Sequence, residues 1–297
     1  MQRVGVVLHP TRPVQGVLDT LDRWAATRGA EVIDLRPRDG TGGPAPPLAR
    51  PAQLAECDLI AAVGGDGTVL TALHAAAATD TPVLGIACGS LGALSAVSAA
   101  GLADALDSIS AGEWWARRLP ALVVSSAHGE VASAVNDVVL IRRGGNQLVI
   151  RIALGDEHYA SLAGDGVVVA TPIGSSAYSM ASGGSLVLAG VEAFVCTPLA
   201  MHGGCAPPIV VPADSTLVLD VDPVHGGFDV EVDGQPVDSA ARRFELTMRE
   251  GFATLVSLDE PDSGVTGLRR RGLITDSPRV LARDARSIHG GLEKALD

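Results

Sequence analysis

Runs of consecutive apolar residues alternate with segments of helical spacing over about the first hundred positions of the chain. Residues 4–8, 31–35, 57–63 and 81–86 are short apolar runs of the kind that form buried strands, whereas residues 14–27 carry apolar side chains three or four positions apart, as one face of a helix does. Strands that alternate with helices predict a parallel sheet whose ligands bind at the carboxyl ends of the strands.

From about residue 119 to residue 256 the pattern changes to short runs rich in valine. Examples are residues 122–124, 138–141, 148–152 and 166–170, which are bounded by Gly, Asp and Asn. Turn residues at intervals of about 8 to 12 positions are typical of an all-β domain.

The two patterns predict a chain with two domains of different class. We expect an α/β N-terminal domain with a Rossmann-like parallel sheet over residues 1–112, and an all-β C-terminal domain over residues 113–268. Residues 269–297, which begin with three arginines, form a tail that is either solvated or returns to the N-terminal domain.

The sequence Gly-Gly-Asp-Gly-Thr at residues 64–68 stands between one of the predicted strands and the helix-like residues 69–75. Glycines at such a turn let backbone N–H groups approach an anion, and the helix N-terminus adds partial positive charge. The carboxylate of Asp66 is then available to hold magnesium or to accept a proton. This pattern predicts a phosphate site.

Composition restricts how that phosphate is held. Lys294 is the only lysine among the 297 residues, so the chain has no Gly-x-x-x-x-Gly-Lys-[Ser/Thr] loop, and backbone N–H groups, hydroxyls and magnesium must do most of the binding. The formal net charge of -12 argues against a nucleic-acid partner. Since no apolar stretch reaches the roughly 18 residues of a membrane span and the N-terminus is unlike a signal peptide, we expect a cytoplasmic protein with no membrane partner.

The four cysteines contain no repeated Cys-x-x-Cys pair, and we predict buried thiols. Cys196, His202 and Cys205 are close in sequence, but their spacing matches no common structural zinc site and a fourth ligand is not evident. The sequence therefore gives no basis for a zinc site.

The β-rich half has its own cluster of polar residues and glycines. Asn136-Asp137 interrupts an apolar strand, Gly164-Asp165-Gly166 opens the next one, and residues 171–179, Thr-Pro-Ile-Gly-Ser-Ser-Ala-Tyr-Ser, follow it. Each of these residues taken singly is an ordinary turn former. Such a density of hydroxyls and carboxylates, in a chain that also carries Asp66, favours a functional site.

Taken in order, these motifs resemble those of the NAD kinase family. The resemblance extends over about residues 1 to 270, and it rests on residues 64–68, residues 85–92, Asn136-Asp137, Asp165-Gly166, residues 171–179, Pro198, His202, residues 209–211 and residues 233–235. Gly-Gly-Asp-Gly-Thr by itself is shared with diacylglycerol and sphingosine kinases, whereas the Thr-Pro-x-Gly-Ser-x-Ala-Tyr stretch is more specific.

The resemblance implies a kinase that transfers the γ-phosphate of ATP to the adenosine 2′-hydroxyl of NAD, with magnesium, in a cleft between the α/β domain and the β-domain. It implies that Asp66 polarises or deprotonates the acceptor hydroxyl and helps to hold the metal. Positioning and charge neutralisation carry most of such a reaction. The family resemblance also implies a homodimer or homotetramer.

By the same resemblance the remaining site residues fall into two groups, one for phosphates and one for the dinucleotide. Gly64, Gly65, Gly67 and Thr68 would bind phosphates. Asn136 and Asp137 would bind adenine and ribose, Asp165 the far part of the dinucleotide, and Ser176, Ala177 and Tyr178 would form the adenine wall.

The chain departs from the family's pattern mainly where the acceptor would bind. Ala87 stands where the family usually has Asn, Ser90 where Arg or His is common, Ala93 where a Phe lines the adenosine pocket, and Pro207 where Arg is frequent. Asp137 replaces Glu, which draws the carboxylate back by roughly 1 to 1.5 Å, about one carbon–carbon bond. The missing Phe removes an aromatic wall worth roughly 1 to 3 kcal/mol in base stacking. The phosphate-binding motif is thus kept while the acceptor pocket is altered.

Three interpretations of this contrast stay open. The chain is a divergent NAD kinase, which is our prediction, or an enzyme that phosphorylates a different hydroxyl, such as that of a nucleoside, a sugar or a lipid-like alcohol, or a non-catalytic nucleotide-binding module. The retention of Asp66, Asp137 and Asp165 speaks against the third. A serine hydrolase built on residues 174–178 is a weaker alternative, because Tyr178 stands where a nucleophile elbow has glycine and no histidine has the spacing of a triad.

Overall fold

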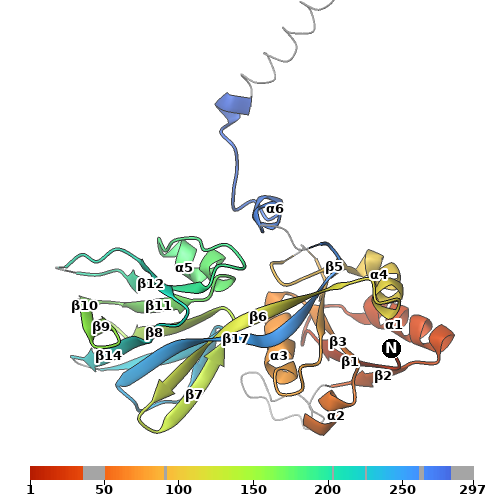
Figure 1. The fold of residues 1–297 in the computed structure, drawn as a ribbon, viewed down its shortest axis with the longest axis horizontal. Coiled ribbons are helices and arrows are strands. Elements are labelled where there is room, and N and C mark those ends of the chain that lie inside the picture. The colour runs from red at the N-terminus through yellow and green to blue at the C-terminus, as the bar shows by residue number, and fades with distance from the viewer. Residues whose placement is uncertain (36–50, 90–91, 203, 225, 261–263, 282–297) are drawn as a thin grey trace, which may run out of the picture.

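A parallel sheet with helices on both faces forms the N-terminal half of the molecule (Figure 1). The computed structural model describes residues 1–35, 51–89, 92–202, 204–224, 226–260 and 264–281. Strands β1 (Arg3–Leu8), β2 (Glu31–Asp34), β3 (Leu59–Gly64) and β4 (Val83–Ala87) pair in the order β4-β3-β1-β2. Every residue of β3 is buried, because both faces of a parallel sheet are covered.

The helices of this half divide between two hydrophobic cores, one on each face of the sheet. Helices α1 (Gln15–Arg28) and α4 (Leu102–Ser110) share the first core, which contains Leu21, Trp24 and Leu106. Helices α2 (Pro51–Ala55) and α3 (Asp66–Ala76) share the second core, which contains Leu54 and Leu73. Short elements β5 (Val97–Ser98) and the 3-10 turn Ala99–Gly101 lead into α4.

The order of the parallel strands reverses between β1 and β3. The connection through α1 leads from β1 outward to β2, whereas the connection through α3 leads from β3 to β4 on the opposite side. In open α/β sheets, ligands bind in the crevice that such a reversal leaves beyond the carboxyl ends of the strands. The N–H of His9 donates to the carbonyl of Val63 at 2.9 Å, so the two loops that border this crevice lie side by side.

Two long strands, β6 (Trp115–Ser126) and β17 (Arg243–Ser257), join the two halves, and both cross between them in Figure 1. Leu255 of β17 pairs in parallel with Val83 of β4, and other parts of β17 pair antiparallel with β6 and with β14. The larger sheet therefore continues from one half into the other, in the order β10-β9-β14-β17-β4-β3-β1-β2.

Two antiparallel sheets face each other in the C-terminal half. The larger sheet contributes β7 (Gly129–Ala134), β9 (Leu148–Leu154), β10 (Glu157–Gly164) and β14 (Leu217–Pro223), together with β6 and β17. The smaller sheet has the order β13-β12-β11-β8-β15-β16, with bounds Ile209–Pro212, Ala193–Leu199, Gly166–Ala170, Asp137–Arg143, Gly227–Val232 and Gln235–Val237. Side chains from both sheets form one core that includes Phe194 and Phe244, both fully buried.

The predicted fold class, an α/β domain followed by an all-β domain, is confirmed. The domain limits at residues 112 and 268 stay predictions. Helix α6 (Val265–Arg270) lies at the second limit, and its Leu268 is buried. Among the residues that the structure describes, no helix is long and apolar enough to cross a membrane.

The core of the β-half gives a test of this packing. Phe244 lies on β17 and stacks edge-on against Phe228, with ring centroids 6.2 Å apart. We expect Phe244→Ala to lower the free energy of unfolding by about 3–5 kcal/mol, because the cavity left by the ring cannot be refilled. Denaturant unfolding measures this loss. Val210→Ala, at a side chain that is 47% exposed on β13, is the control and should change the free energy by no more than about 0.5 kcal/mol.

Candidate active site

The Gly-Gly-Asp-Gly-Thr motif forms the turn between β3 and α3. Gly65 precedes the helix in an extended conformation, and its carbonyl accepts from the N–H of Thr68 at 2.9 Å. A Cβ atom on Gly64 would lie 2.3 Å from Oγ1 of Thr68, so only glycine fits there. Within the described residues no side chain caps this helix, so the N–H groups of Asp66 and Gly67 remain available to an anion.

The carboxylate of Asp66 is held by the loop that follows β4. Its Oδ2 accepts from the N–H of Ala93 at 2.9 Å and its Oδ1 from the N–H of Leu94 at 3.1 Å. A Cβ on Gly92 would lie 2.1 Å from Oδ1, which shows how closely this loop approaches the carboxylate. A carboxylate has about four lone-pair sites, so the two bonds fix its orientation and leave room for a hydroxyl or a metal ion.

The buried carboxylate of Asp233 connects the β-half to helix α3. It accepts from the N–H groups of Val135 at 2.9 Å, Asn136 at 2.7 Å and Asp137 at 3.1 Å. Its Oδ2 also lies 2.6 Å from Nε2 of His74, which stands on the same helix as Asp66. The Asn136-Asp137 motif is therefore held in a fixed position relative to the helix that begins with Asp66.

The carboxyl of Asp137 is itself buried, with 7% exposure. Burial, together with the smaller effect of the nearby charges of Asp233 and Glu231, raises its pKa to about 7. Near neutral pH this carboxyl is therefore partly protonated, and in that form it donates a hydrogen bond as well as accepting them.

The hydroxyls of residues 171–179 mostly hold the loop together. Oγ1 of Thr171 donates to the carbonyl of Val135 at 2.6 Å, and a Cβ on Gly174 would lie 2.0 Å from the carbonyl oxygen of Asn136. Ser176 donates to the carbonyl of Ile173 at 3.0 Å. The loop contains the 3-10 turn Gly174–Ser176 and the short helix α5 (Tyr178–Ala181), and it packs directly against the Asn136-Asp137 motif. Tyr178 is 40% exposed.

Asp165 lies away from the other predicted site residues. It precedes β11, whose last residue, Ala170, pairs with Asp137, so the backbones of the two aspartates are about 16 Å apart along the strand. Its Oδ1 lies 2.6 Å from Nε of Arg142. The structure thus brings Asn136 and Asp137 together with the loop at residues 171–179 but leaves Asp165 at the opposite end of the same sheet.

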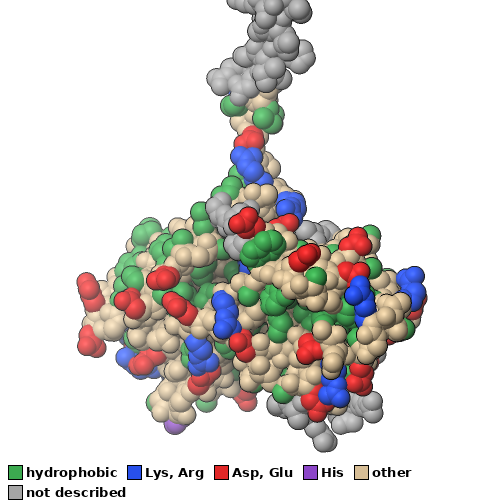
Figure 2. Space-filling model, turned by 45° about the vertical axis from the view of Figure 1, so that its right-hand side comes forward, with side chains coloured by type: hydrophobic (Ala, Val, Ile, Leu, Met, Phe, Trp, Pro, Cys, Tyr) green, Lys and Arg blue, Asp and Glu red, His purple; other side chains and the backbone are tan. Residues whose placement is uncertain are grey.

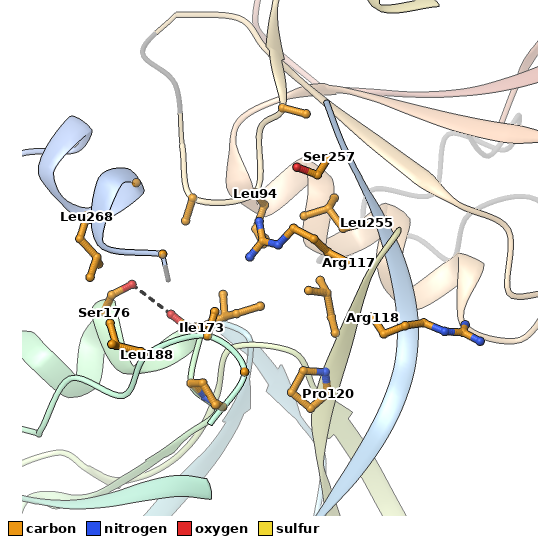
Figure 3. A pocket seen from close by; sticks show the side chains of 18 of the residues that line it. Leu94, Arg117, Arg118, Pro120, Ile173, Ser176, Leu188, Leu255, Ser257 and Leu268 are labelled. Atoms are coloured by element: carbon orange, nitrogen blue, oxygen red, sulfur yellow. Dashed lines mark hydrogen bonds between the residues drawn. The ribbon is translucent and has the colours of Figure 1, made fainter. Parts of the chain in front are cut away.

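A cavity of about 780 Å³ opens between the two halves (Figure 3). Its wall includes Leu94, Arg117, Ser176, Leu188, Leu255 and Leu268, which come from both halves and from α6. Ala93 also lines the cavity, so two of the predicted acceptor-site residues face this space. Oγ of Ser95 is buried and has no hydrogen-bond partner among the described residues.

Family models and curated relatives match both halves of the chain. The family model for the ATP-NAD kinase N-terminal domain matches residues 47–114, and the model for the C-terminal domain matches residues 135–252. An NAD kinase of Heliobacterium modesticaldum is 35% identical over 245 residues, which cover 80% of this chain and 86% of that protein. This chain belongs to the NAD kinase family. An NAD kinase of Halorubrum lacusprofundi is also 35% identical, over 83% of this chain and 91% of its own.

Solved structures of NAD kinase relatives share the fold. Yeast NADH kinase complexed with NADH matches with a TM-score of 0.78 and 20% identity, over 93% of this chain and 89% of that chain. An NAD kinase from Archaeoglobus fulgidus in complex with ATP matches with a TM-score of 0.70 and 20% identity, over 92% of this chain and 100% of that one.

The positions at which this NAD kinase family member departs from the family's pattern lie in different surroundings. Ala87 is buried at the end of β4, where it pairs with Gly64, and Ala93 lines the cavity. The carbonyl of Pro207 accepts from the hydroxyl of Tyr159 at 2.7 Å. Ser90 lies outside the described residues.

The structure also bears on the two other chemistries that the sequence raised. The hydroxyls of Ser175 and Ser176 donate to backbone carbonyls, and in the described part of the chain neither is paired with a histidine, as a serine nucleophile would be.

Cys196 is fully buried, and burial raises the pKa of its thiol to about 12. The prediction of buried thiols is wrong for Cys205, which is exposed. No group of three candidate metal ligands occurs among the described residues.

The sequence indicates no contact for three residues that bind predicted site residues: His74, Arg142 and Asp233. Asp233 belongs to the family pattern, and its partner His74 falls eight positions after Asp66 on the same helix. Nothing in the local pattern signals either pairing, because the partners are far apart in the chain. The Asp-Gly pair at residues 233–234 does predict a tight hairpin turn, and both residues have the positive φ that this turn requires.

The raised pKa of Asp137 predicts how stability depends on pH. An unfolded aspartate loses its proton near pH 4, whereas Asp137 in the folded protein loses it near pH 7. The folded state therefore binds more protons between these values, and the free energy of unfolding should fall as pH rises from about 4 to 7. Asp137→Asn removes the buried ionisable group. The free energy of unfolding of the variant should therefore exceed that of the wild type by a few kcal/mol at pH 8.

Denaturant unfolding from pH 5 to pH 8 measures this difference. Asp156→Asn, at an exposed turn residue, is the matched control. Parallel profiles for wild type and Asp137→Asn would contradict the raised pKa.

Proposed function

We propose that this protein transfers the γ-phosphate of ATP to the 2′-hydroxyl of the adenosine ribose of NAD, giving NADP. Membership of the NAD kinase family supports this reaction class, a phosphotransferase with a hydroxyl acceptor. The observation that carries the proposal is the carboxylate of Asp66. It is oriented by two backbone N–H groups at an uncapped helix N-terminus, beside the crevice of the parallel sheet.

In the proposed reaction, Asp66 orients the acceptor hydroxyl and accepts its proton. The oxygen of that hydroxyl forms the new bond to the γ-phosphorus, the bond between this phosphorus and the β,γ-bridging oxygen breaks, and ADP leaves with the electron pair. Gly65 leaves room for phosphate oxygens to approach the backbone, while Gly64 leaves room for the side chain of Thr68. The N–H of Gly67 at the helix start and the hydroxyl of Thr68 would bind these oxygens and stabilise their charge.

The residues present fit a magnesium ion that is bound together with the nucleotide. Magnesium is usually held by one or two carboxylates plus substrate phosphates and keeps several waters, and Asp66 supplies one such carboxylate. When bound, the ion would neutralise charge on the phosphates, while Asp66 would help to hold it.

The acceptor would lie between the Asn136-Asp137 motif and the loop at residues 171–179. We propose that Asn136 and Asp137 bind adenine and ribose and that Ser176, Ala177 and Tyr178 form the adenine wall. Asp165 would bind the part of the dinucleotide farthest from Asp66, since it lies at the other end of β11.

Three further predictions concern the protein's surroundings. We propose a cytoplasmic protein that assembles as a homodimer or homotetramer. We propose no nucleic-acid partner, because acidic and basic side chains are mixed on the face shown in Figure 2 and the net charge is -12.

The role of Asp66 is tested by Asp66→Asn. The amide cannot accept the proton, so we expect ADP release with ATP, Mg²⁺ and NAD to fall by about a hundredfold or more. Asp104→Asn removes an acidic residue from the first turn of another helix, α4, and should leave the rate unchanged. A folded Asp66→Asn protein that stays active would contradict the proposed role. Wild-type ADP release that does not depend on NAD would point to another acceptor.

The identity of the acceptor is tested at Ala93. If adenosine binds in the cavity that this residue lines, Ala93→Phe adds a stacking surface, and KM for NAD should fall by about tenfold. Ala93→Leu adds similar bulk without an aromatic ring and separates stacking from simple filling of space. An unchanged KM for NAD, with loss of turnover of a nucleoside, sugar or lipid-like alcohol, would favour the second of the interpretations given above.

A further inference from the structure

The loop after β1 is held in a defined shape by His9. Nδ1 of His9 accepts from the N–H groups of Thr11 at 3.2 Å and Arg12 at 3.1 Å. The N–H of His9 donates in turn to the carbonyl of Val63, the residue before Gly64. The turn that carries Arg12 is therefore fixed against the strand that ends in the Gly-Gly-Asp-Gly-Thr motif.

The guanidinium of Arg12 reaches across the carboxyl ends of the strands. Its Nη1 donates to the carbonyl of Cys88, after β4, at 2.9 Å. The same atom is 4.0 Å from the place that a Cβ on Gly65 would take, and 3.6 Å from that of Gly89. The cation thus lies over glycine backbone from the loops after β3 and β4, beside the reversal point of the sheet.

The charge of Arg12 is not neutralised by a carboxylate within the described residues. Arg3 pairs with Glu31 and Glu56, and Arg28 pairs with Asp107. Among the residues that the structure describes, the hydrogen bonds of Arg12 involve only Cys88 and His9. A guanidinium has five N–H donors, and one of them is used by Cys88. Within the described part of the chain, the other four donors and the positive charge of Arg12 have no partner, and they lie beside a loop suited to phosphate. Lys294 is the only lysine in the sequence.

We infer that Arg12 binds the phosphates of the nucleotide donor. This inference rests on the proposed function, since it assigns the cation of that same site. A planar guanidinium matches two phosphate oxygens at once, and its charge-assisted bonds would supply the neutralisation that a P-loop lysine gives elsewhere. The bond to Cys88 holds the side chain in place before the nucleotide arrives, so little side-chain freedom is lost on binding.

The inference is tested by steady-state kinetics of Arg12→Gln and Arg12→Lys. The loss of an ionic hydrogen bond to phosphate should raise KM for ATP by about tenfold to a hundredfold in Arg12→Gln, with KM for NAD changed less than about twofold. Arg12→Lys restores the charge and should recover part of the loss. Arg23→Gln is the control, because Arg23 lies on α1 and bonds to Asp19 and Thr20 instead.

A second measurement, the shift in melting temperature on ligand binding, does not require catalysis. It therefore tests phosphate binding by Arg12 independently of the proposed reaction. Tripolyphosphate with Mg²⁺ should raise the melting temperature of the wild type and of Arg23→Gln, and raise that of Arg12→Gln clearly less. If Arg12 only ties the loops together, Arg12→Gln would melt lower without ligand, bind tripolyphosphate as well as the wild type and keep its KM for ATP. That outcome would overturn the inference even if Asp66→Asn is inactive. An active Asp66→Asn would instead overturn the proposed function and leave the tripolyphosphate result standing.

Discussion

The buried carboxylate of Asp233 is the contact on which the rest of the site depends. A carboxylate removed from water must have its oxygens satisfied, and here three backbone N–H groups and the ring of His74 do so. The three N–H groups belong to the segment that leads into β8, and His74 belongs to α3. One side chain therefore fixes the distance between the Asn136-Asp137 motif and the helix that carries Asp66.

The continuous sheet gives that contact a rigid frame. Because β17 pairs with β4 and also with β6 and β14, the parallel strands and the larger sheet of the β-half belong to one hydrogen-bonded structure. Catalysis of phosphoryl transfer depends mainly on position and charge. Asp137 begins β8 of the smaller sheet, which packs against the larger sheet through a shared core. The cavity lined by Ala93 and Ser176 lies at the junction of the two halves.

The two sides of the site, one proposed for phosphate and one for the acceptor, differ in charge. On the proposed phosphate side lie the uncapped start of α3 and the cation of Arg12, which both favour anions. On the proposed acceptor side the carboxyl of Asp137 is buried beside Asp233 and holds its proton up to about pH 7. A neutral carboxyl next to a charged one avoids repulsion between the two and can still bind a ribose hydroxyl.

The sequence by itself determined the elements of the fold and one half of the site. Periodicity placed β1, α1, β2 and β3, because burial on both faces or on one helical face leaves a pattern in neighbouring residues. The motif at residues 64–68 predicted the turn around Asp66 for a similar reason, since its glycines are needed where they stand. The tertiary structure alone decided which distant residues meet. Asp233 meets His74, and Arg12 lies over Gly65, although the two residues of each pair are distant in the chain. The pairing of strands likewise sets Asp165 apart from Asp137. No local pattern encodes such relations between distant segments.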